Sequence, residues 1–240
     1  MTTLGLICPS DHAVFGPVAR RLCERGVTVE FFDPGVNVEP ERLADLDLLV
    51  NKKVRWASIR ALEDAYRAGV PAWNDYVATM LCLNRLSQLR ALAVAGFAVP
   101  DVRVDRPARP YVAKDFLDFE GPRLNGEGDF YQPLLDFDGI DHKYYAVDDG
   151  ETVRTAVVRF RSKLFGERER LGQGTVDPRV HTRLERLLQF TGARGLGVDV
   201  VEVGDEPYAI DANPATSFKH TGLDEALVDS LATAAGHTGE

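Results

Sequence analysis

Lysine is scarce in this chain of 240 residues, and so are cysteine and long apolar runs. The three cysteines, Cys8, Cys23 and Cys82, are too few and too scattered to predict a disulfide framework or a zinc site. No window approaches the roughly 18 consecutive apolar residues of a membrane-spanning helix. The first residues lack a basic start, and Pro9 interrupts their apolar run, so they do not have the pattern of a signal peptide. We therefore expect a soluble, cytoplasmic protein.

The charge balance also excludes one class of partner. The net charge is −9 and the sequence pI is about 5.1, whereas sequence-independent nucleic-acid binding needs a basic face. Only six of the 28 lysines and arginines are lysines, so the position of each lysine is informative. The length allows one large or two small domains with a sizeable core.

The first ~75 residues alternate between strand and helix patterns, which predicts a small parallel sheet covered by helices. Strands are expected at 4–10, 27–33, 45–51 and 70–75, and helices at 13–26 and 57–69. One long helix is predicted over 76–96.

The second part has the pattern of an α+β domain with antiparallel strands. Strands are expected at 97–104, 111–119, 130–136, 141–147, 152–160, 196–203 and 207–213, helices at 178–192 and 223–236, and a loop at 120–129. The domain boundary is placed so that 1–75 and 76–240 form the two domains.

Three oxygen donors lie on what we interpret as neighbouring antiparallel strands near the C-terminus. Asp211 and Asn213 are two residues apart and share a face, and Asp199 interrupts an otherwise apolar strand. A carboxylate within a buried sheet needs a partner, and three such oxygens would suit Mg²⁺. The alternative is that the two aspartates are solvated strand ends and Asn213 forms a turn before Pro214.

Lys114 also interrupts an apolar strand, so it either pairs with an anion or extends its amine to solvent from an edge strand. The apolar stretch that follows it offers a binding surface for a flat ring. Backbone groups from Gln132 to Leu135, with Leu134 between them, could flank an aromatic base, and Asp138 could reach a ribose hydroxyl.

Several cations cluster further along the chain. Lys143 lies on a predicted strand, and Arg159, Arg161 and Lys163 alternate, which would place the three side chains on one face. Like charges in that arrangement repel unless an anion neutralises them. A triphosphate would do so, and so would solvent.

The order of these motifs resembles the ATP-grasp fold over nearly the whole chain. A strand lysine is followed by Gln-Pro-Leu-Leu, a Gly-x-Asp-x-Lys strand, Phe-Arg-Ser-Lys-Leu, and finally Gly-Val-Asp with Asp-x-Asn-Pro. The sequence is most similar to carboxylate–amine ligases of the ribosomal-protein-S6-modification type. The resemblance implies Asp199, Asp211 and Asn213 as ligands of Mg²⁺ (or Mn²⁺). It also implies Lys114 on the nucleotide phosphates, and Lys143 and Arg161 at the γ-phosphate or reacting group.

The chain departs from that pattern at four places. Asp211 replaces the usual Glu, Lys163 replaces the usual Asn, and Arg85 occupies the place of the first phosphate lysine. Only 17 residues separate Lys114 from Gln132, where related proteins carry a Gly-rich lid, so residues 120–129 would form a reduced lid.

The chain also resembles the ATP-grasp inositol-phosphate kinases, which likewise have Asp in the Asp-x-Asn motif. The cations Lys52, Lys53 and Arg55 could then bind a polyphosphate, a substrate carboxylate, or only solvent. Lys219 and His220 are further candidates for substrate binding. His142 is interpreted as an ordinary strand residue, and Trp56 and Trp73 as core residues.

The resemblance predicts an ATP- and magnesium-dependent ligase that joins a carboxylate to an amine through an acylphosphate. The alternatives are a small-molecule kinase acting on an inositol-phosphate-like polyol, and an ATP-binding module without activity. The expected partner is a small-molecule or peptide substrate, with no nucleic acid and no membrane. The oligomeric state stays open, a homodimer included.

Overall fold

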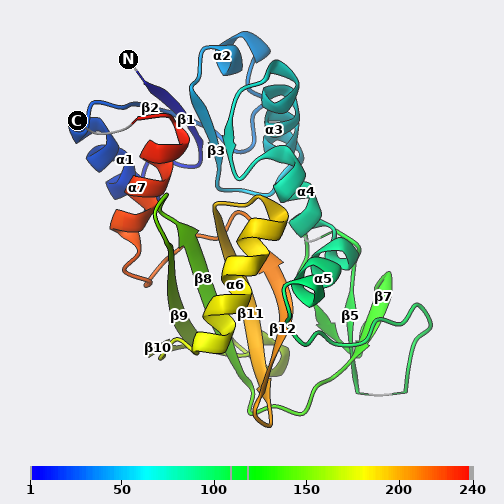
Figure 1. Cartoon of the computed structure of the whole chain (residues 1–240). Helices are drawn as coiled ribbons and strands as arrows, with labels where there is room; N and C mark the ends of the chain where they lie inside the picture. Colours follow the sequence, from blue (N-terminus) through cyan, green and yellow to red (C-terminus); the bar gives the residue numbers. More distant parts are fainter. Residues whose placement is uncertain (1, 109, 118, 238–240) are drawn as a thin grey trace.

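A four-stranded parallel sheet, in the order β2-β1-β3-β4, forms the N-terminal part of the computed structural model, which describes residues 2–108, 110–117 and 119–237 (Figure 1). Its elements are β1 (Thr3–Ile7), α1 (Phe15–Glu24), β2 (Thr28–Phe32), α2 (Pro40–Ala44), β3 (Leu48–Asn51), α3 (Trp56–Ala68) and β4 (Ala72–Trp73). Apolar residues of α1 cover one face of the sheet, and those of α2 and α3 cover the other. The predicted parallel sheet is confirmed; the short helix α2 was not predicted.

The predicted long helix over 76–96 is wrong, because the stretch forms two helices. These are α4 (Tyr76–Leu83) and α5 (Arg85–Val94). Asn84, between them, is extended and caps α5 by accepting a hydrogen bond from Ser87 N at 3.0 Å. The N–H of Arg85 donates to Phe116 O at 2.8 Å, so a bond to a crossing segment replaces one that would continue the helix.

A small three-stranded antiparallel sheet follows, in the order β6-β5-β7. Its strands are β5 (Tyr111–Lys114), β6 (Arg123–Leu124) and β7 (Phe130–Pro133). The strand predicted over 111–119 ends at Lys114, and the loop predicted over 120–129 contains β6. The strand predicted over 97–104 is reduced to isolated bridges at Ala98 and Arg103.

A five-stranded antiparallel sheet, in the order β10-β9-β8-β11-β12, carries the rest of the chain. Its strands are β8 (Ile140–Asp148), β9 (Val153–Arg161), β10 (Arg170–Gln173), β11 (Gly195–Val203) and β12 (Glu206–Asn213). Helices α5 and α6 (Pro178–Thr191) cover one face of it with an apolar core. Strand β12 bulges at Ile210, because Asp199 pairs with Asp211 whereas the next residue, Val200, pairs with Ala209.

The C-terminal helix α7 (Asp224–Ala234) returns to the N-terminal part of the molecule and lies beside α1 (Figure 1). Its residues Leu227 and Leu231 share one apolar core with Leu6 of β1 and with Val147 of β8. The last helix therefore packs on both sheets, and the division into 1–75 and 76–240 stays a prediction. None of the described helices combines the length and the apolarity that crossing a membrane requires.

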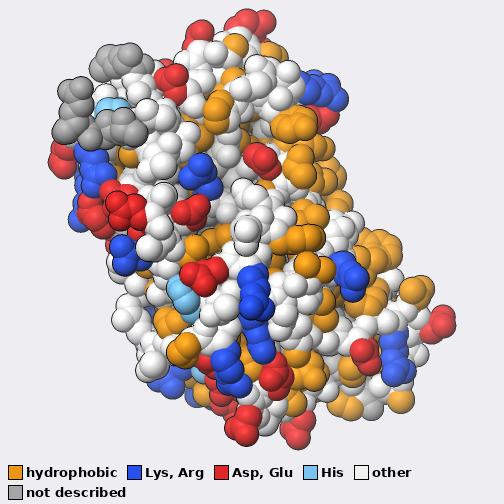
Figure 2. Space-filling model, viewed as in Figure 1, with side chains coloured by type: hydrophobic (Ala, Val, Ile, Leu, Met, Phe, Trp, Pro, Cys, Tyr) orange, Lys and Arg blue, Asp and Glu red, His pale blue; other side chains and the backbone are white. Residues whose placement is uncertain are grey.

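The surface shown in Figure 2, which carries α6, has acidic and basic side chains intermixed rather than a patch of one sign. Ion pairs on it join neighbouring charges, as between Arg183 and Glu206.

Candidate active site

The face of the five-stranded sheet opposite α5 and α6 carries a row of charged residues. Lys143 of β8 pairs with Asp199 of β11, and Asp199 pairs with Asp211 of β12, so the three lie side by side across three strands. Lys143 Nζ lies 3.1 Å from Asp199 Oδ1. Gly197 makes room for this row, because a Cβ there would lie 3.2 Å from Lys143 Cε and 2.8 Å from Thr216 Oγ1.

Asn213 is the third predicted metal ligand, and it pairs with Gly197 on the same face as Asp211. Its Oδ1 accepts a hydrogen bond from Ala215 N at 2.8 Å, so Asn213 also forms the predicted turn. An amide oxygen has two lone pairs and can still face a cation. The described residues contain no group of three His, Cys, Asp or Glu that could hold a metal ion. Two carboxylates and an amide oxygen nevertheless fit Mg²⁺, because this ion is commonly held by one or two protein carboxylates together with phosphate oxygens of a bound nucleotide.

Asn74 fixes the end of the strand that carries these ligands. The side chain is buried, and its Nδ2 donates to Gly195 O at 2.6 Å and to Pro214 O at 2.9 Å. Its Oδ1 accepts from the N–H groups of Arg194 and Gly195 at 2.7 and 3.1 Å. One amide from the end of β4 therefore ties β11 to the residue after Asn213.

A pocket lies between the small sheet and the end of the large sheet, and we call it the inter-sheet pocket. The predicted site residues that line it are Lys114, Gln132, Leu134, Leu135, Lys163, Asp199 and Asp211. Lys114 is 5% exposed, and its Nζ donates to the carbonyl oxygen of Ile210, the bulged residue, at 2.6 Å. Gln132 Nε2 donates to Pro100 O at 3.2 Å. Lys114 thus lines the same pocket as Asp199 and Asp211 and does not extend to solvent.

Residues 115–117 and 119–129, which we call the lid segment, close one side of this pocket through Pro122. Arg85 is buried at its base, where Nη2 donates to Glu120 O at 2.7 Å and Nε lies 3.8 Å from Asp211 Oδ1. A Cβ on Gly121 would lie 3.0 Å from Lys163 Nζ, so the lid segment reaches that lysine. Arg85 therefore connects the lid segment to Asp211 of β12.

The outer side of the lid segment contacts the N-terminal part of the molecule. The ring of Trp56, at the start of α3, lies 4.9 Å from that of Phe119, centroid to centroid. Trp56 is 66% exposed, so its prediction as a core residue is wrong, whereas Trp73 is fully buried as predicted. Trp56 is the first residue of α3, and its side chain lies on the surface against the lid segment.

A second pocket, which we call the lysine pocket, lies between the N-terminal sheet and the five-stranded sheet. Its charged and polar lining includes His12, Lys52, Lys53, Lys143, Arg168, Asn213, Lys219 and His220. Together the two pockets take up all six lysines of the chain. They meet at the ion pair described above, because Asp199 lines one pocket and Lys143 lines the other.

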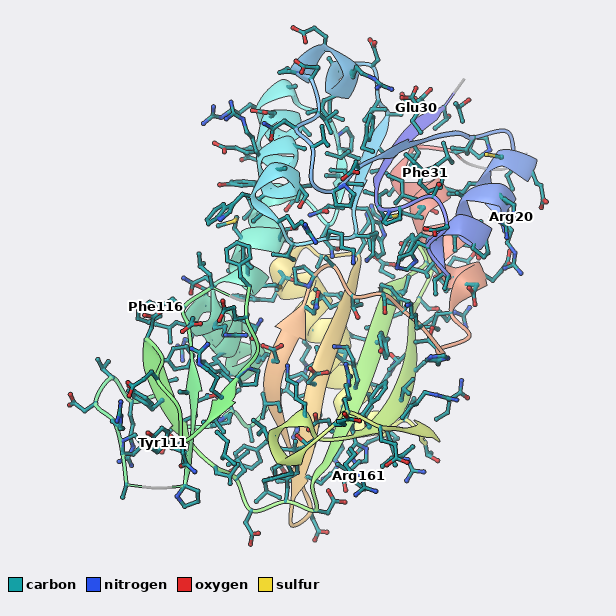
Figure 3. All side chains as sticks on the ribbon, turned by 180° about the vertical axis from the view of Figure 1, so that it is seen from behind. Arg20, Glu30, Phe31, Tyr111, Phe116 and Arg161 are labelled. Carbon is teal, nitrogen blue, oxygen red and sulfur yellow. The ribbon has the colours of Figure 1, made fainter. Side chains whose placement is uncertain are left out.

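Three predicted site residues, Arg161, Asp138 and Arg55, lie outside both pockets. Arg161 pairs with Ile140, and His142 with Arg159, so these side chains project from the face opposite Lys143. Arg161 is exposed and forms an ion pair with Glu169 at the far end of β9, where Figure 3 labels it. Its predicted place beside Lys143 is therefore wrong.

Lys163 does not continue the alternation of β9, because the strand ends at Arg161 and Ser162 begins the short 3₁₀-helix η1 (Lys163–Phe165). Asp138 is exposed and accepts from Ile140 N at 2.9 Å, outside the lining of either pocket. Arg55 is exposed at the start of α3 and also lies outside both linings. A ribose contact by Asp138 stays a prediction.

Three lining residues with a charged or imidazole side chain were not predicted. Arg168 follows η1 and lies over the ring of Phe160 at 3.9 Å, which brings its charge to the lysine pocket from outside any strand pattern. His12 precedes α1, and its Nδ1 accepts from the N–H groups of Val14 and Phe15 at 3.2 Å. Asp141 is two residues before Lys143 on the same face, and that spacing could have identified it.

Burial and neighbouring charge shape the titration of this face. Burial raises the pKa of Asp141, and the Asp199 carboxylate raises it further. For Lys143 burial acts to lower the pKa, but the Asp199 carboxylate and other anionic groups outweigh it, so the pKa is raised. Lys143 is therefore held as a cation where the two pockets meet.

Comparison of the whole chain with solved structures gives matches across almost its full length. The RimK domain ATP-grasp protein from Sphaerobacter thermophilus DSM 20745 superposes with a TM-score of 0.72 at 18% identity, covering 99% of each chain. The ATP-grasp ligase PsnB, solved with a minimal precursor, gives 0.72 at 16% identity over 97% of this chain and 99% of that one. This chain has the ATP-grasp fold.

A third similar structure is the macrocyclase MdnC bound with precursor peptide MdnA from Microcystis aeruginosa MRC. It gives a TM-score of 0.70 at 11% identity, covering 95% of this chain and 98% of that chain. PsnB has also been solved with minimal precursor, Mg and ADP. No family model and no curated protein sequence matches the chain. The predicted fold is confirmed, and these structures lend no support to the kinase alternative.

Proposed function

We propose that the protein is an ATP- and Mg²⁺-dependent ligase that joins a carboxylate to an amine through an acylphosphate. One observation carries the proposal: all six lysines of an acidic chain line two pockets, which meet at the pair formed by Lys143 and Asp199. A ligase of this type needs one site for a nucleotide and an adjoining site for an anionic acceptor. The ligases of the same fold support the assignment.

In this proposal the inter-sheet pocket holds ATP. Its apolar lining around Leu134 and Leu135 takes the base, and Lys114 and Lys163 face the phosphates. Asp199, Asp211 and Asn213 would hold Mg²⁺, which supplies charge neutralisation of the phosphates when bound. The cationic side chains are fixed before the substrate arrives, so little reorganisation accompanies the reaction.

The acceptor carboxylate binds in the lysine pocket beside Lys143. One carboxylate oxygen attacks the γ-phosphorus, the bond to the bridging oxygen breaks, and ADP leaves with that electron pair. The amine nitrogen then attacks the acyl carbon, inorganic phosphate leaves, and the amine loses a proton. Lys143 stabilises the negative charge that accumulates on the transferring group, and positioning supplies much of the remaining rate.

The proposal is tested by ADP release from Mg·ATP with candidate acids and amines, singly and in pairs. We expect release that requires an acid, and hydroxamate formation when hydroxylamine replaces the amine, because hydroxylamine captures an acylphosphate. Asp211→Asn should abolish both signals while the protein stays folded. ADP release with a polyol phosphate alone would contradict the ligase and favour a kinase; ATP binding without any turnover would favour an inert module.

A further inference from the structure

The lysine pocket is strongly one-signed in a chain whose net charge is −9. Its cationic and imidazole groups come from five separate segments: His12, Lys52, Lys53, Lys143, Arg168, Lys219 and His220. No acidic side chain lines this pocket among the residues that the structure describes. Asp199, which pairs with Lys143, lines the other pocket, so the remaining cations have no carboxylate facing them within the lining. Such a pocket suits an anionic ligand.

Lys52 differs from the other lysines of this pocket because it is buried in an aromatic cage. The side chain is 3% exposed, and its Nζ lies 4.7 Å from the ring centroid of Phe15 and 5.0 Å from those of Trp73 and Phe218. Among the described residues, Nζ has no hydrogen-bond partner. Burying an amine without a partner costs several kcal/mol when it is charged, and cation–π contacts repay only part of that.

The surroundings of Lys52 offer no internal anion. Burial lowers its pKa from 10.5 to about 7, and the nearby Cys8 thiol acts in the opposite direction. Burial in turn raises the pKa of Cys8 to about 11, so that thiol is neutral at pH 7. His12, Lys53 and Lys219 line the same pocket, and Asp11, which is not among its lining residues, acts on His12 and Cys8. A neutral Lys52 thus avoids the cost of an unpaired buried charge until an anion enters.

The position of the cage relative to Lys143 follows from strand geometry. A Cβ on Gly195 would lie 2.5 Å from Trp73 and 3.3 Å from Phe218, and a Cβ on Gly197 would lie 3.2 Å from Lys143. The two glycines are on the same face of β11, two residues apart, which is roughly 7 Å along a strand. The cage and Lys143 therefore lie about one strand repeat apart on one wall.

We propose that the substrate carries a second compact anionic group, a carboxylate or a phosphate, besides the reacting carboxylate, and that Lys52 binds this second group and gains a proton as it does so. The reacting carboxylate lies beside Lys143, which rests on the proposed function, and the second group lies in the lysine pocket beside Lys52 Nζ. The spacing fits a diacid whose two carboxylates are separated by a few carbons, such as glutarate. A monocarboxylate would leave Lys52 unpaired and neutral.

The test uses the full chain labelled with ¹³C-lysine, because six lysines give six resolvable Cε signals in NMR spectra. The Lys52 signal is assigned by its absence in Lys52→Met and, independently, by NOEs to the ring protons of Phe15 and Phe218. Its pH titration is recorded alone and with glutarate, with inorganic phosphate, and with acetate. No ATP or amine is present, so a failed ligase assay leaves this measurement intact, and the reverse also holds.

We expect Lys52 to titrate near pH 7 in the free protein, and glutarate or phosphate to move that midpoint upward by at least one pH unit. The probe that moves it identifies the second group as carboxylate or phosphate. Acetate should move it far less, and the Lys163 signal in the other pocket should not respond to glutarate. Arg55→Met is the matched control, because Arg55 is a nearby exposed cation outside both linings, and the Lys52 titration and its response should remain in it. No response to either dianion, or an equal response to acetate, would overturn the proposal.

Discussion

Lys143 contributes a buried positive charge where the two pockets meet, and Arg161 contributes an exposed one on the opposite face of the same sheet. If transition-state charge is stabilised at Lys143, then Lys143→Met should lower kcat for ADP release by about 100-fold or more. Arg161→Met should change kcat less than twofold, because its guanidinium faces Glu169. Steady-state kinetics on both variants checks this. Equal losses of kcat would contradict the placement of Lys143 and Arg161 on opposite faces of the sheet.

Lys52 makes a pH-dependent contribution to stability whose sign can be worked out. Its pKa in the folded protein, about 7, is below the ordinary value of 10.5 expected after unfolding. Between pH 7 and 10.5 the unfolded chain therefore binds more protons, and stability rises with pH through that window. Below pH 7 the cost of the charged, buried amine is fully present.

Lys52→Met removes that amine while keeping a flexible apolar side chain, so the variant should be more stable than the wild type. The difference in Tm should be largest near pH 6 and should shrink as the pH rises through 7 toward 10. Differential scanning calorimetry across this range measures it. A lower Tm for the variant at pH 6, or a difference independent of pH, would show that Lys52 is not a buried, unpaired amine.

At the scale of elements, β12 owes its position to groups outside the sheet. Asn74 joins Pro214, the residue after it, to the start of β11 at Gly195. Lys114 donates to the carbonyl of its bulge, and Gln88 Nε2 donates to Ala212 O at 2.5 Å. The carboxylate of Asp211 therefore depends on the junction of β4 with β11 and on helix α5. Metal ligands held this way gain precision from residues that never touch the metal.

Asn74→Ala would leave two carbonyl and two N–H groups without their side-chain partner, so it should cost about 3 kcal/mol of unfolding free energy. It should also raise the Mg²⁺ concentration needed for half-maximal ADP release, because the residue after Asn213 loses its anchor. Asn84→Ala is the matched control, since it removes a helix cap worth about 1 kcal/mol. Urea unfolding measures the free energy of unfolding of both variants. Similar losses would contradict the special role of the four Asn74 hydrogen bonds.

The lid segment illustrates how contacts distant in sequence decide an element. The helical pattern continues through Asn84, yet the helix breaks there because the segment after β5 takes the hydrogen bonds. Local propensity could not reveal this, since Phe116 and Leu117 lie far along the chain. The same contacts give the short lid segment a fixed base at Arg85.

At the scale of the whole molecule, the order of motifs along the sequence was enough to predict the fold and both carboxylates of the row. Apolar alternation located the strands, and a polar residue within each apolar strand marked Lys114, Lys143, Asp199 and Asp211. These positions could be predicted because an isolated charge in a buried strand has few explanations.

The register between strands could not be predicted in the same way. The turn between β8 and β9 fixes which residues of β9 face Lys143, and this register places Arg161 on the other side. The cage around Lys52 also needed the fold, since Phe15, Trp73 and Phe218 come from three segments that only tertiary packing brings together. Arg168 lies outside any regular pattern altogether.

The lysines are divided between the two pockets: two line the inter-sheet pocket and four line the lysine pocket. The ion pair of Lys143 and Asp199 lies where the pockets meet. If the inter-sheet pocket holds ATP and the lysine pocket holds the acid, phosphoryl transfer must take place between a γ-phosphate and a carboxylate oxygen. That oxygen leaves with the phosphate when the amine displaces it.

The most direct measurement follows an ¹⁸O label from the acid. An acid substrate labelled with ¹⁸O in its carboxylate is turned over with Mg·ATP and an amine, and the inorganic phosphate is analysed by mass spectrometry. The account predicts one ¹⁸O atom in each phosphate released, in step with formation of the amide. Phosphate that carries no ¹⁸O while ADP and amide accumulate would contradict an acylphosphate, and with it the central claim.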